Sequence, residues 1–299
     1  LALLYRMCGD LGEGLPVARG GTGGLMDALA AAATAQGAEV RLNCPVAGII
    51  VDQGQACGVE LADGELIRAP KIVSSADPKT SFLQLLGAQH LDIQFTHRIS
   101  RLRTDGYVAK LHLALDSLPE FNGLARPDGR LLLTPDMAFI ENAYDAAKYG
   151  GYARELPMEV VIPSLQDDSL APSGQHVLSA LVQYAPCKVK GGWDAHHNTF
   201  LDNAIASLER YAPDIRTHII ASELLTPYDL EQQYRVTGGH WHHAEFALDN
   251  WWMNRPTYGA SQYSTPVPGF YLCGAGAHPG GGIMGAAGHN AARAILEEN

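Results

Sequence analysis

The 299-residue sequence has no long apolar run, few cysteines and fewer basic than acidic residues. Because no stretch of about eighteen apolar residues occurs, no transmembrane helix is predicted. The net charge of −11 argues against nucleic acid as a partner. The five cysteines show no paired spacing, which argues against a disulfide framework or a zinc site and fits a cytoplasmic location.

The most informative segment is the glycine-dense stretch from Gly274 to Gly288. An apolar run precedes it, and an alanine-rich segment that continues to Leu296 follows it. This order predicts a strand, a tight loop and a helix N-terminus. Glycines let a ligand approach the backbone closely, and a helix N-terminus offers unpaired N–H groups and a positive dipole end. The alternative is a turn that only packs a helix onto a sheet.

This segment resembles the C-terminal flavin-binding segment of the phytoene desaturase-like FAD-dependent oxidoreductases. The string Gly-x-Gly-x-His-Pro-Gly-Gly-Gly-x-x-Gly, which begins at Gly274, is typical of their "pyridine nucleotide-disulfide oxidoreductase domain-containing" branch. The resemblance extends more weakly over nearly the whole chain. It implies an α/β plus α+β fold, with a partial FAD-binding domain of the glutathione reductase-like or amine oxidase-like type and an inserted mixed-sheet substrate domain. The implied segments are 1–80 and 265–299 for FAD binding and 81–264 for the substrate.

One expected part of such a protein is not found in the sequence. Members of the family begin with a strand, a Gly-x-Gly-x-x-Gly turn and a helix that hold the ADP half of FAD. The nearest string begins at Gly20, but no apolar strand precedes it, and Met26 stands where the last glycine is required. We therefore interpret it as a loop before a helix over residues 25–36. The chain is expected to be the C-terminal part of a longer protein, without the dinucleotide-binding unit. Since no Cys-x-x-Cys or Cys-x-x-x-x-Cys occurs, the disulfide-reductase part of the branch name does not carry over.

The resemblance implies that three regions of this chain contact FAD. The first meets the adenine, the second lies beside the ribityl chain and the pyrophosphate, and the third presents a helix N-terminus to the pyrimidine edge of the flavin. There the helix dipole stabilises the negative charge of reduced flavin by about 0.3–2 kcal/mol. For the first region, a plain core valine is an equally good interpretation. The residues are Val46 for the first region, Gly274 and Ala275 for the second, and Gly282, Ile283 and Met284 for the third.

A histidine cluster begins at His240. Considered without relatives, His240 and His242 on one face of a strand, with Glu245 nearby, could bind a metal. No second cluster at ligand spacing supports this, and no metal is predicted. In the family the segment belongs to the substrate chamber, which makes His243 the candidate general acid or base, because the pKa of histidine lies near neutrality. The alternative for His243 is a structural histidine held by hydrogen bonds.

Four aromatic residues follow the histidine cluster. They line an apolar substrate cavity, or they are core residues between two lobes. They are Trp251, Trp252, Tyr258 and Tyr263.

Periodicity predicts alternating strands and helices through the rest of the chain. Strands are expected over 40–42, 46–51, 58–61 and 64–67 (a hairpin with Asp63-Gly64 at its turn), 71–77, 107–115, 158–162, 176–184 and 218–225. Helices are expected over 78–86 and 194–211, with a short one that begins at Pro227.

These features predict an FAD-dependent oxidoreductase of the desaturase or dehydrogenase type. It would take a hydride from a lipophilic small molecule and pass electrons to an acceptor that the sequence does not identify. Such a substrate is compatible with peripheral membrane contact, although no basic amphipathic helix supports it. The alternatives are a non-catalytic module that keeps the fold without binding FAD and, more distantly, a metal-dependent hydrolase.

Overall fold

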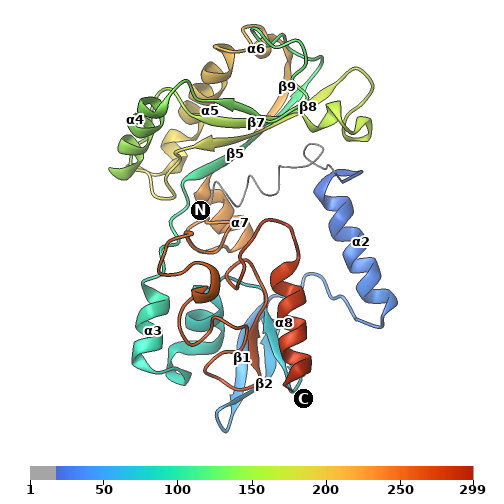
Figure 1. Ribbon diagram of the computed structural model, residues 1–299, viewed down its shortest axis with the longest axis vertical. Helices are drawn as coiled ribbons and strands as arrows, with labels where there is room; N and C mark the ends of the chain where they lie inside the picture. Colours follow the sequence, from blue (N-terminus) through green and yellow to red (C-terminus); the bar gives the residue numbers. More distant parts are fainter. Residues whose placement is uncertain (1–17, 299) are drawn as a thin grey trace. The chain divides into compact units, whose positions relative to one another are not determined.

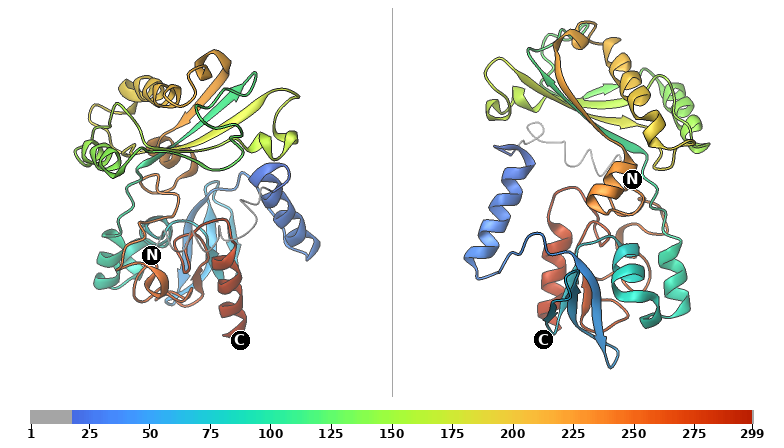
Figure 2. Two further views of the ribbon diagram at one scale, coloured as in Figure 1. Left: turned by 45° about the horizontal axis from the view of Figure 1, so that its top comes forward. Right: turned by 180° about the vertical axis from the view of Figure 1, so that it is seen from behind.

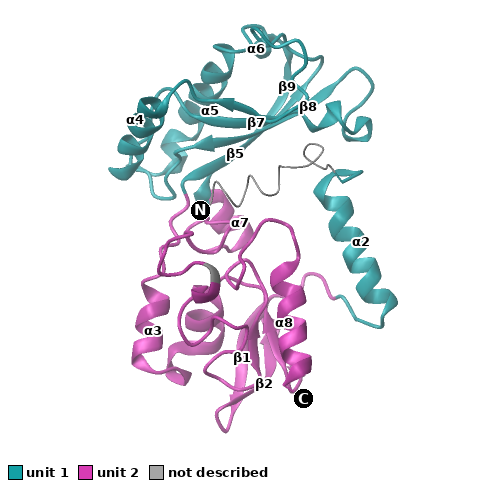
Figure 3. Cartoon of the chain, viewed as in Figure 1, with its two compact units in different colours: residues 1–40, 107–228 teal, residues 41–106, 229–299 magenta. Residues whose placement is uncertain are grey.

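The structure, a computed structural model, describes residues 18–298 and divides into two compact units (Figure 3). Unit 1 comprises residues 1–40 and 107–228, and unit 2 comprises residues 41–106 and 229–299. Helices and sheets occur in both units, which confirms the predicted α/β plus α+β class. The functional division into 1–80, 81–264 and 265–299 stays a prediction. The boundaries between the two compact units, at 40/41, 106/107 and 228/229, differ from the predicted boundaries at 80/81 and 264/265.

A five-stranded sheet forms the centre of unit 1 (Figure 1). Its order is β6 (Leu131–Leu133), β7 (Met158–Val161), β8 (His176–Gln183), β5 (Val108–Leu115) and β9 (Ile219–Leu225). Every pairing is antiparallel, so the sheet is not mixed as predicted. Side chains of β5 alternate strictly between buried and half-buried, as expected for a sheet with one face on the core.

Helices cover one face of this sheet. Figures 1 and 2 show α4 (Met137–Lys148) and α5 (Trp193–Glu209) on the same side. From α5, the side chains of Phe200 and Leu208 are fully buried and belong to the same core cluster as Leu111 of β5. Burial of each such side chain contributes about 1.5–3 kcal/mol. The shorter helices of unit 1 are η3 (Pro163–Leu165), η4 (Asp168–Leu170) and α6 (Ile215–His218).

The alanine-rich helix α2 (Gly21–Ala35) also belongs to unit 1 and begins four residues before the predicted start at residue 25. None of its residues is buried. The backbone N–H of Gly20, which precedes the helix, donates to the Asp167 carboxylate at 2.6 Å. The strand predicted over 40–42 is wrong, because these residues pair with no strand in the described part of the chain.

Unit 2 contains two small sheets. The first is antiparallel and consists of β1 (Val46–Asp52), β2 (Gln55–Leu61) and β3 (Leu66–Arg68), with the predicted turn at Gly64. The second is a parallel pair of β4 (Ile72–Ser74) and β10 (Phe270–Leu272). The parallel pair brings the last tenth of the chain back beside residues 72–74.

Aromatic side chains fix β10 within unit 2. The Phe82 ring packs edge-to-face at 4.9 Å from the Phe95 ring and at 5.6 Å from the Phe270 ring. Phe82 comes from the π-helix η1 (Thr80–Gly87), and Phe95 comes from α3 (Ile93–Ser100). This cluster holds the start of β10 in place, and β10 leads into the glycine-rich segment and then α8 (Ala286–Glu297).

The remaining helices among the described residues are short. They are η2 (Ala88–His90), α7 (Pro227–Tyr234), which lies where the chain passes from unit 1 to unit 2, and η5 (Trp252–Asn254). Within residues 18–298, no helix has the length and apolar character needed to cross a bilayer.

Candidate cofactor-binding site

The glycine-rich loop starts from a strand that is bonded along both edges. On one side, Cys273 N donates to Ser74 O at 2.9 Å, and on the other, Leu272 N donates to Tyr263 O at 2.8 Å. Since β10 is fixed in this way, the loop that follows it begins at a defined place.

A cavity of about 310 Å³ lies over this loop, within unit 2. This volume is at the lower end of the range for small-molecule sites, so it fits part of a large cofactor rather than a whole dinucleotide. All but one of the lining residues come from the segment 273–288. The lining consists of Trp241, Cys273, Gly274, Ala275, Gly280, Gly281, Gly282, Ile283, Met284, Gly285, Ala286, Ala287 and Gly288.

The glycines of this segment serve two different purposes. A Cβ at Gly274 would lie 2.2 Å from the carbonyl oxygen of Ser75, and one at Gly276 would lie 2.6 Å from Pro78 Cδ. These glycines allow the loop to pack on the chain after β4. A Cβ at Gly288 would instead meet no atom within 4 Å, although Gly288 is in the first turn of α8 and lines the cavity. A side chain at Gly288 would therefore project into open space beside the cavity.

The N-terminus of α8 has no side-chain cap. Its N-cap residue, Gly285, adopts the left-handed conformation with φ 66° and makes no capping hydrogen bond. The next three N–H groups, of Ala286, Ala287 and Gly288, have no acceptor within the helix, and all three residues line the cavity. Unpaired N–H groups and a positive dipole end in a cradle without side chains fit the electron-rich edge of a flavin.

Five of the six residues predicted to contact FAD line this cavity: Gly274, Ala275, Gly282, Ile283 and Met284. Ile283 has φ 61°, a conformation that costs a β-branched residue about 1–3 kcal/mol. Val46, the sixth, does not line the cavity. It is the first residue of β1, opposite Leu61, and its side chain is half-buried, so it is not a fully buried core valine. Its contact with FAD stays a prediction.

His243 lies beside the glycine loop but is not a lining residue of the cavity. Its Cβ would be 3.5 Å from a Cβ at Gly276, and its Nδ1 is buried without a hydrogen-bond partner among residues 18–298. Burial lowers the pKa of His243, the charge of Arg255 lowers it further, and Asp77 opposes both effects. The imidazole is therefore neutral at neutral pH. The alternative, a structural histidine held by hydrogen bonds, does not agree with the lack of a hydrogen bond at Nδ1 within the described residues. The catalytic role of His243 stays a prediction.

Residues 240–250 form an irregular loop and not the strand that we expected. Gly238 and Gly239 have φ 66° and 64°, which ends any extended run before His240. His240 and His242 therefore do not share a strand face. In the described residues, no group of three or more His, Cys, Asp or Glu side chains is placed to hold a metal ion.

Among the described side chains, Trp251, Tyr258 and Tyr263 do not line the cavity, whereas Trp241 does, and the side chain of Trp252 lies outside the described part of the structure. The Trp251 ring packs at 5.5 Å from the Phe246 ring, and Tyr263 packs against the core of unit 2. Tyr258 is 80% exposed. For Tyr263 the core interpretation is the one that the structure supports.

Sequence reasoning missed a buried carboxylate close to the loop. Asp77 is only 2% exposed and accepts from Thr80 Oγ1 at 2.7 Å and from Thr237 Oγ1 at 2.9 Å. It therefore joins the start of η1 to the segment that leads into the histidine cluster. The only signal in the sequence was its position in a turn before Pro78.

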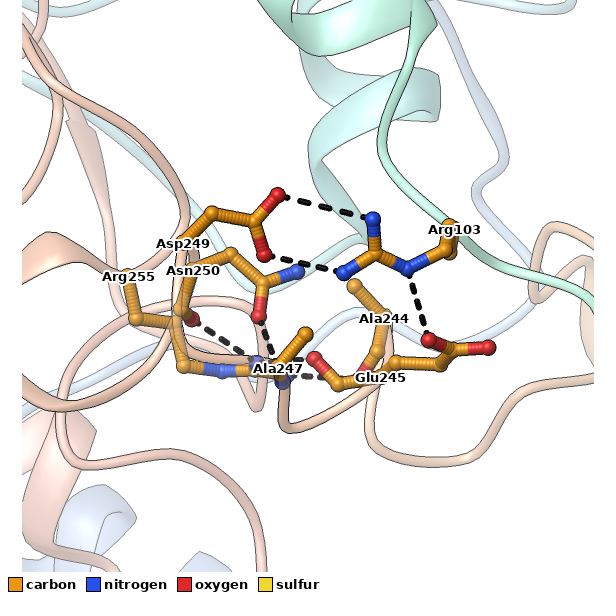
Figure 4. A network of polar contacts seen from close by, with 7 residues as sticks. All are labelled: Arg103, Ala244, Glu245, Ala247, Asp249, Asn250 and Arg255. Atoms are coloured by element: carbon orange, nitrogen blue, oxygen red, sulfur yellow. Dashed lines mark hydrogen bonds and ion pairs between the residues drawn. The ribbon is translucent and has the colours of Figure 1, made fainter.

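A network of two arginines around the loop 242–250 was also missed (Figure 4). Arg103 forms exposed ion pairs with Glu245 at 2.7 Å and with Asp249 at 2.9 Å. Arg255 is completely buried, and its hydrogen-bond acceptors in the described part of the chain are all backbone carbonyl groups. The two arginines thus hold the same loop by different means.

A buried strand that leads through a glycine cradle into an uncapped helix is typical of proteins that bind an anionic, nucleotide-derived cofactor. The chain belongs to the flavin containing amine oxidoreductase family, whose model matches residues 2–296. It is 39% identical over 315 residues to pyridine nucleotide-disulfide oxidoreductase domain-containing protein 2 of Mus musculus, with 99% of this chain and 54% of that protein covered. It is 26% identical over 287 residues to a neurosporene-forming phytoene desaturase of Cereibacter sphaeroides, with 92% and 52% covered.

These relatives confirm the resemblance on which the sequence interpretation rests. The chain spans about half the length of the curated relatives it matches. Among solved structures, an oxidoreductase from Methanosarcina mazei matches with a TM-score of 0.60 and 19% identity, over 93% of this chain and 55% of that chain. At this identity the match supports the fold alone.

Proposed function

We propose that this chain is the flavin-contacting and substrate-binding part of an FAD-dependent oxidoreductase of the desaturase or dehydrogenase type. The observation that carries the proposal is the cavity over the glycine loop, into which the uncapped first turn of α8 opens. The name of one relative, a phytoene desaturase, supports desaturation of a lipophilic small molecule.

Bound FAD would accept a hydride from the substrate. The chain's own residues bind and orient it. The N–H groups of Ala286, Ala287 and Gly288 favour negative charge in the cavity by about 0.3–2 kcal/mol. Ile283 and Met284, which are 64% and 43% exposed, present apolar side chains at the rim and reduce the access of water. Neutral His243 is able to hold a proton at Nδ1, which has no hydrogen-bond partner within the described residues.

The proposal is tested by incubating the purified chain with FAD, desalting it and recording the visible absorbance spectrum. Retained flavin bands are expected, and bleaching of these bands by a lipophilic substrate in the absence of oxygen would support the reaction type. A colourless protein after desalting would contradict flavin binding by this chain.

One observation favours the second candidate function, a non-catalytic module that keeps the fold. The other glycine-rich helix start, at α2, does not offer an anion site, because the Asp167 carboxylate already accepts from Gly20 N. Within the described residues, α2 therefore supplies no place for the pyrophosphate of FAD. A colourless chain that still unfolds cooperatively would favour this candidate.

A further inference from the structure

Arg255 is the largest fully buried side chain among the described residues. It lies between two segments of unit 2, the loop 242–250 and the glycine loop. Nε donates to the Ala275 carbonyl at 3.0 Å, and the other two nitrogens donate to carbonyl oxygens of the loop 242–250. These are Glu245 at 3.3 Å, Asn250 at 3.4 Å, Ala244 at 3.1 Å and His242 at short range.

The positive charge of Arg255 is balanced by dipoles and not by a carboxylate. All of its hydrogen-bond acceptors among residues 18–298 are backbone carbonyl groups. The acidic side chains of the same loop, Glu245 and Asp249, pair with Arg103 at the surface. Burial lowers the pKa of Arg255 to about 10, which still leaves the guanidinium charged at neutral pH.

The guanidinium lies close to two backbone positions that line the cavity. Ala275 and Gly280 line the cavity, and Arg255 Nε lies 3.6 Å from the position of a Cβ at Gly280. The Phe246 ring packs on the guanidinium with 4.6 Å to its centroid and reaches within 2.7 Å of the same Gly280 position. Arg255 and Phe246 together therefore support the side of the loop that faces away from the cavity.

We propose that Arg255 is a positioning residue of the cofactor site: it holds the glycine loop to the loop 242–250 and places a positive charge that has no carboxylate partner beside the cavity. This inference rests on the proposed function. In a site with little water, a fixed charge acts over several ångströms and favours an anionic ligand over a neutral one. The reduced, anionic form of a bound flavin should gain more from it than the oxidised form.

Three variants separate the geometry from the charge. Arg255→Met removes the charge and all of the hydrogen bonds, whereas Arg255→Lys keeps the charge and loses most of the hydrogen bonds. Arg103→Met is the matched control, because it releases the same loop from Glu245 and Asp249 without touching the glycine loop. Circular dichroism checks that each variant is folded, and only folded variants are compared.

Two measurements on the flavin-loaded chain test the proposal. Arg255→Met should weaken flavin binding about ten- to a hundredfold, since several buried carbonyls lose a charged donor. It should also lower the midpoint potential of the flavin, whereas Arg255→Lys restores the potential but not the full affinity. A midpoint potential that is the same in Arg255→Met and Arg103→Met would overturn the electrostatic role.

A third measurement needs no flavin and distinguishes this inference from the proposed function. In the flavin-free chain, the titration of His243 followed by NMR reports the charge, because Arg255 lowers the pKa of His243 while Asp77 raises it. Arg255→Met should raise this pKa, and Arg103→Met should leave it unchanged. If the wild-type chain retains no flavin but this shift in pKa occurs, the proposed function is contradicted, whereas the inference of a positive charge beside the cavity is supported. If the shift is absent, the inference fails.

Discussion

The helices α2 and α8 begin in the same way but meet opposite surroundings. Each has a glycine at the N-cap in the left-handed conformation, with φ 78° at Gly20 and 66° at Gly285, and neither N-cap has a capping side chain of its own. At α2, the Asp167 carboxylate accepts from Gly20 N. At α8, the first turn opens into the cavity.

The comparison shows that a glycine-rich helix start is not a ligand site by itself. Both starts offer the positive end of a dipole, although the first N–H group of α2, that of Gly21, donates to Ala18 O at 2.8 Å. What differs is whether the protein supplies the anion. At α2 the anion is the Asp167 carboxylate, which is held in place because it also accepts from the backbone N–H and the hydroxyl of Ser169 at 3.0 and 2.6 Å.

The largest effect is expected when the cavity at α8 is filled. Gly288→Leu should abolish flavin retention, because the new side chain projects from the first turn of α8 into the open space beside the cavity. The fold should be kept, since leucine favours a helix over glycine by up to about 1 kcal/mol. The measurement is flavin absorbance after desalting.

The matched control for this variant is Gly23→Leu in α2. A Cβ at Gly23 also meets no atom within 4 Å. This variant should retain flavin like the wild-type chain. If Gly288→Leu bound flavin as well as Gly23→Leu does, the cavity would not be the cofactor site.

The second effect concerns the glycines that pack the loop. Gly274→Ala places a Cβ 2.2 Å from the Ser75 carbonyl oxygen, so the backbone must move. The free energy of unfolding should fall by about 1–3 kcal/mol. Urea unfolding measures it, with Gly23→Ala as the control that should be neutral or stabilising. Equal unfolding free energies for the two variants would contradict the close packing at Gly274.

A smaller effect follows when α8 is given its own anion. Ala286→Asp adds a carboxylate to the first turn, which should stabilise the helix by about 0.3–1 kcal/mol. The same carboxylate should weaken flavin binding about tenfold, because it competes with the flavin for the N–H groups of α8 and repels the electron-rich flavin edge. Flavin titration measures the affinity, and Ala286→Asn, which has a similar size but no charge, is the control. An equal loss of affinity in the asparagine variant would indicate a steric effect and contradict the role of the charge.

The smallest effect is expected at α2. Hydrogen bonds from Ser169 and from Gly20 lower the pKa of Asp167. A lowered folded-state pKa means that the stabilisation is present above the unfolded value of about 3.9 and is lost as the pH falls through the folded value.

Asp167→Asn should therefore lower the Tm at neutral pH and make no difference in strong acid, where the wild-type carboxyl is protonated. Thermal unfolding across this pH range measures the difference. Flavin retention should not change. A Tm difference that persists in strong acid would show that shape, and not charge, matters at this position.

The local patterns of the sequence were enough for much of the fold and for most of the candidate site. Strict alternation over 107–115 predicted β5, because a strand with one face on the core must alternate. The glycine string predicted the strand, loop and helix around the cavity, because a glycine-rich turn and the start of a helix can both be recognised from neighbouring residues in the sequence. The same string supplied every predicted residue that lines the cavity.

The missed features depend on contacts between segments that are distant in the sequence. Arg255 reaches Ala275, 20 residues away, and Asp77 reaches Thr237, 160 residues away. No periodicity indicates such contacts. The helix α4 was missed although Asp136 caps it by accepting from Phe139 N at 2.8 Å, a local signal that could have predicted it.

Cys273 lies in the wall of the cavity, at the point where β10 ends. Burial raises the pKa of its thiol, so the sulfur is protonated at neutral pH. The thiolate, and not the thiol, is the form that reacts with oxidants and alkylating reagents. The sulfur in the wall of the proposed flavin site is therefore kept in its less reactive form, and a ligand in the cavity should shield it further from chemical labelling.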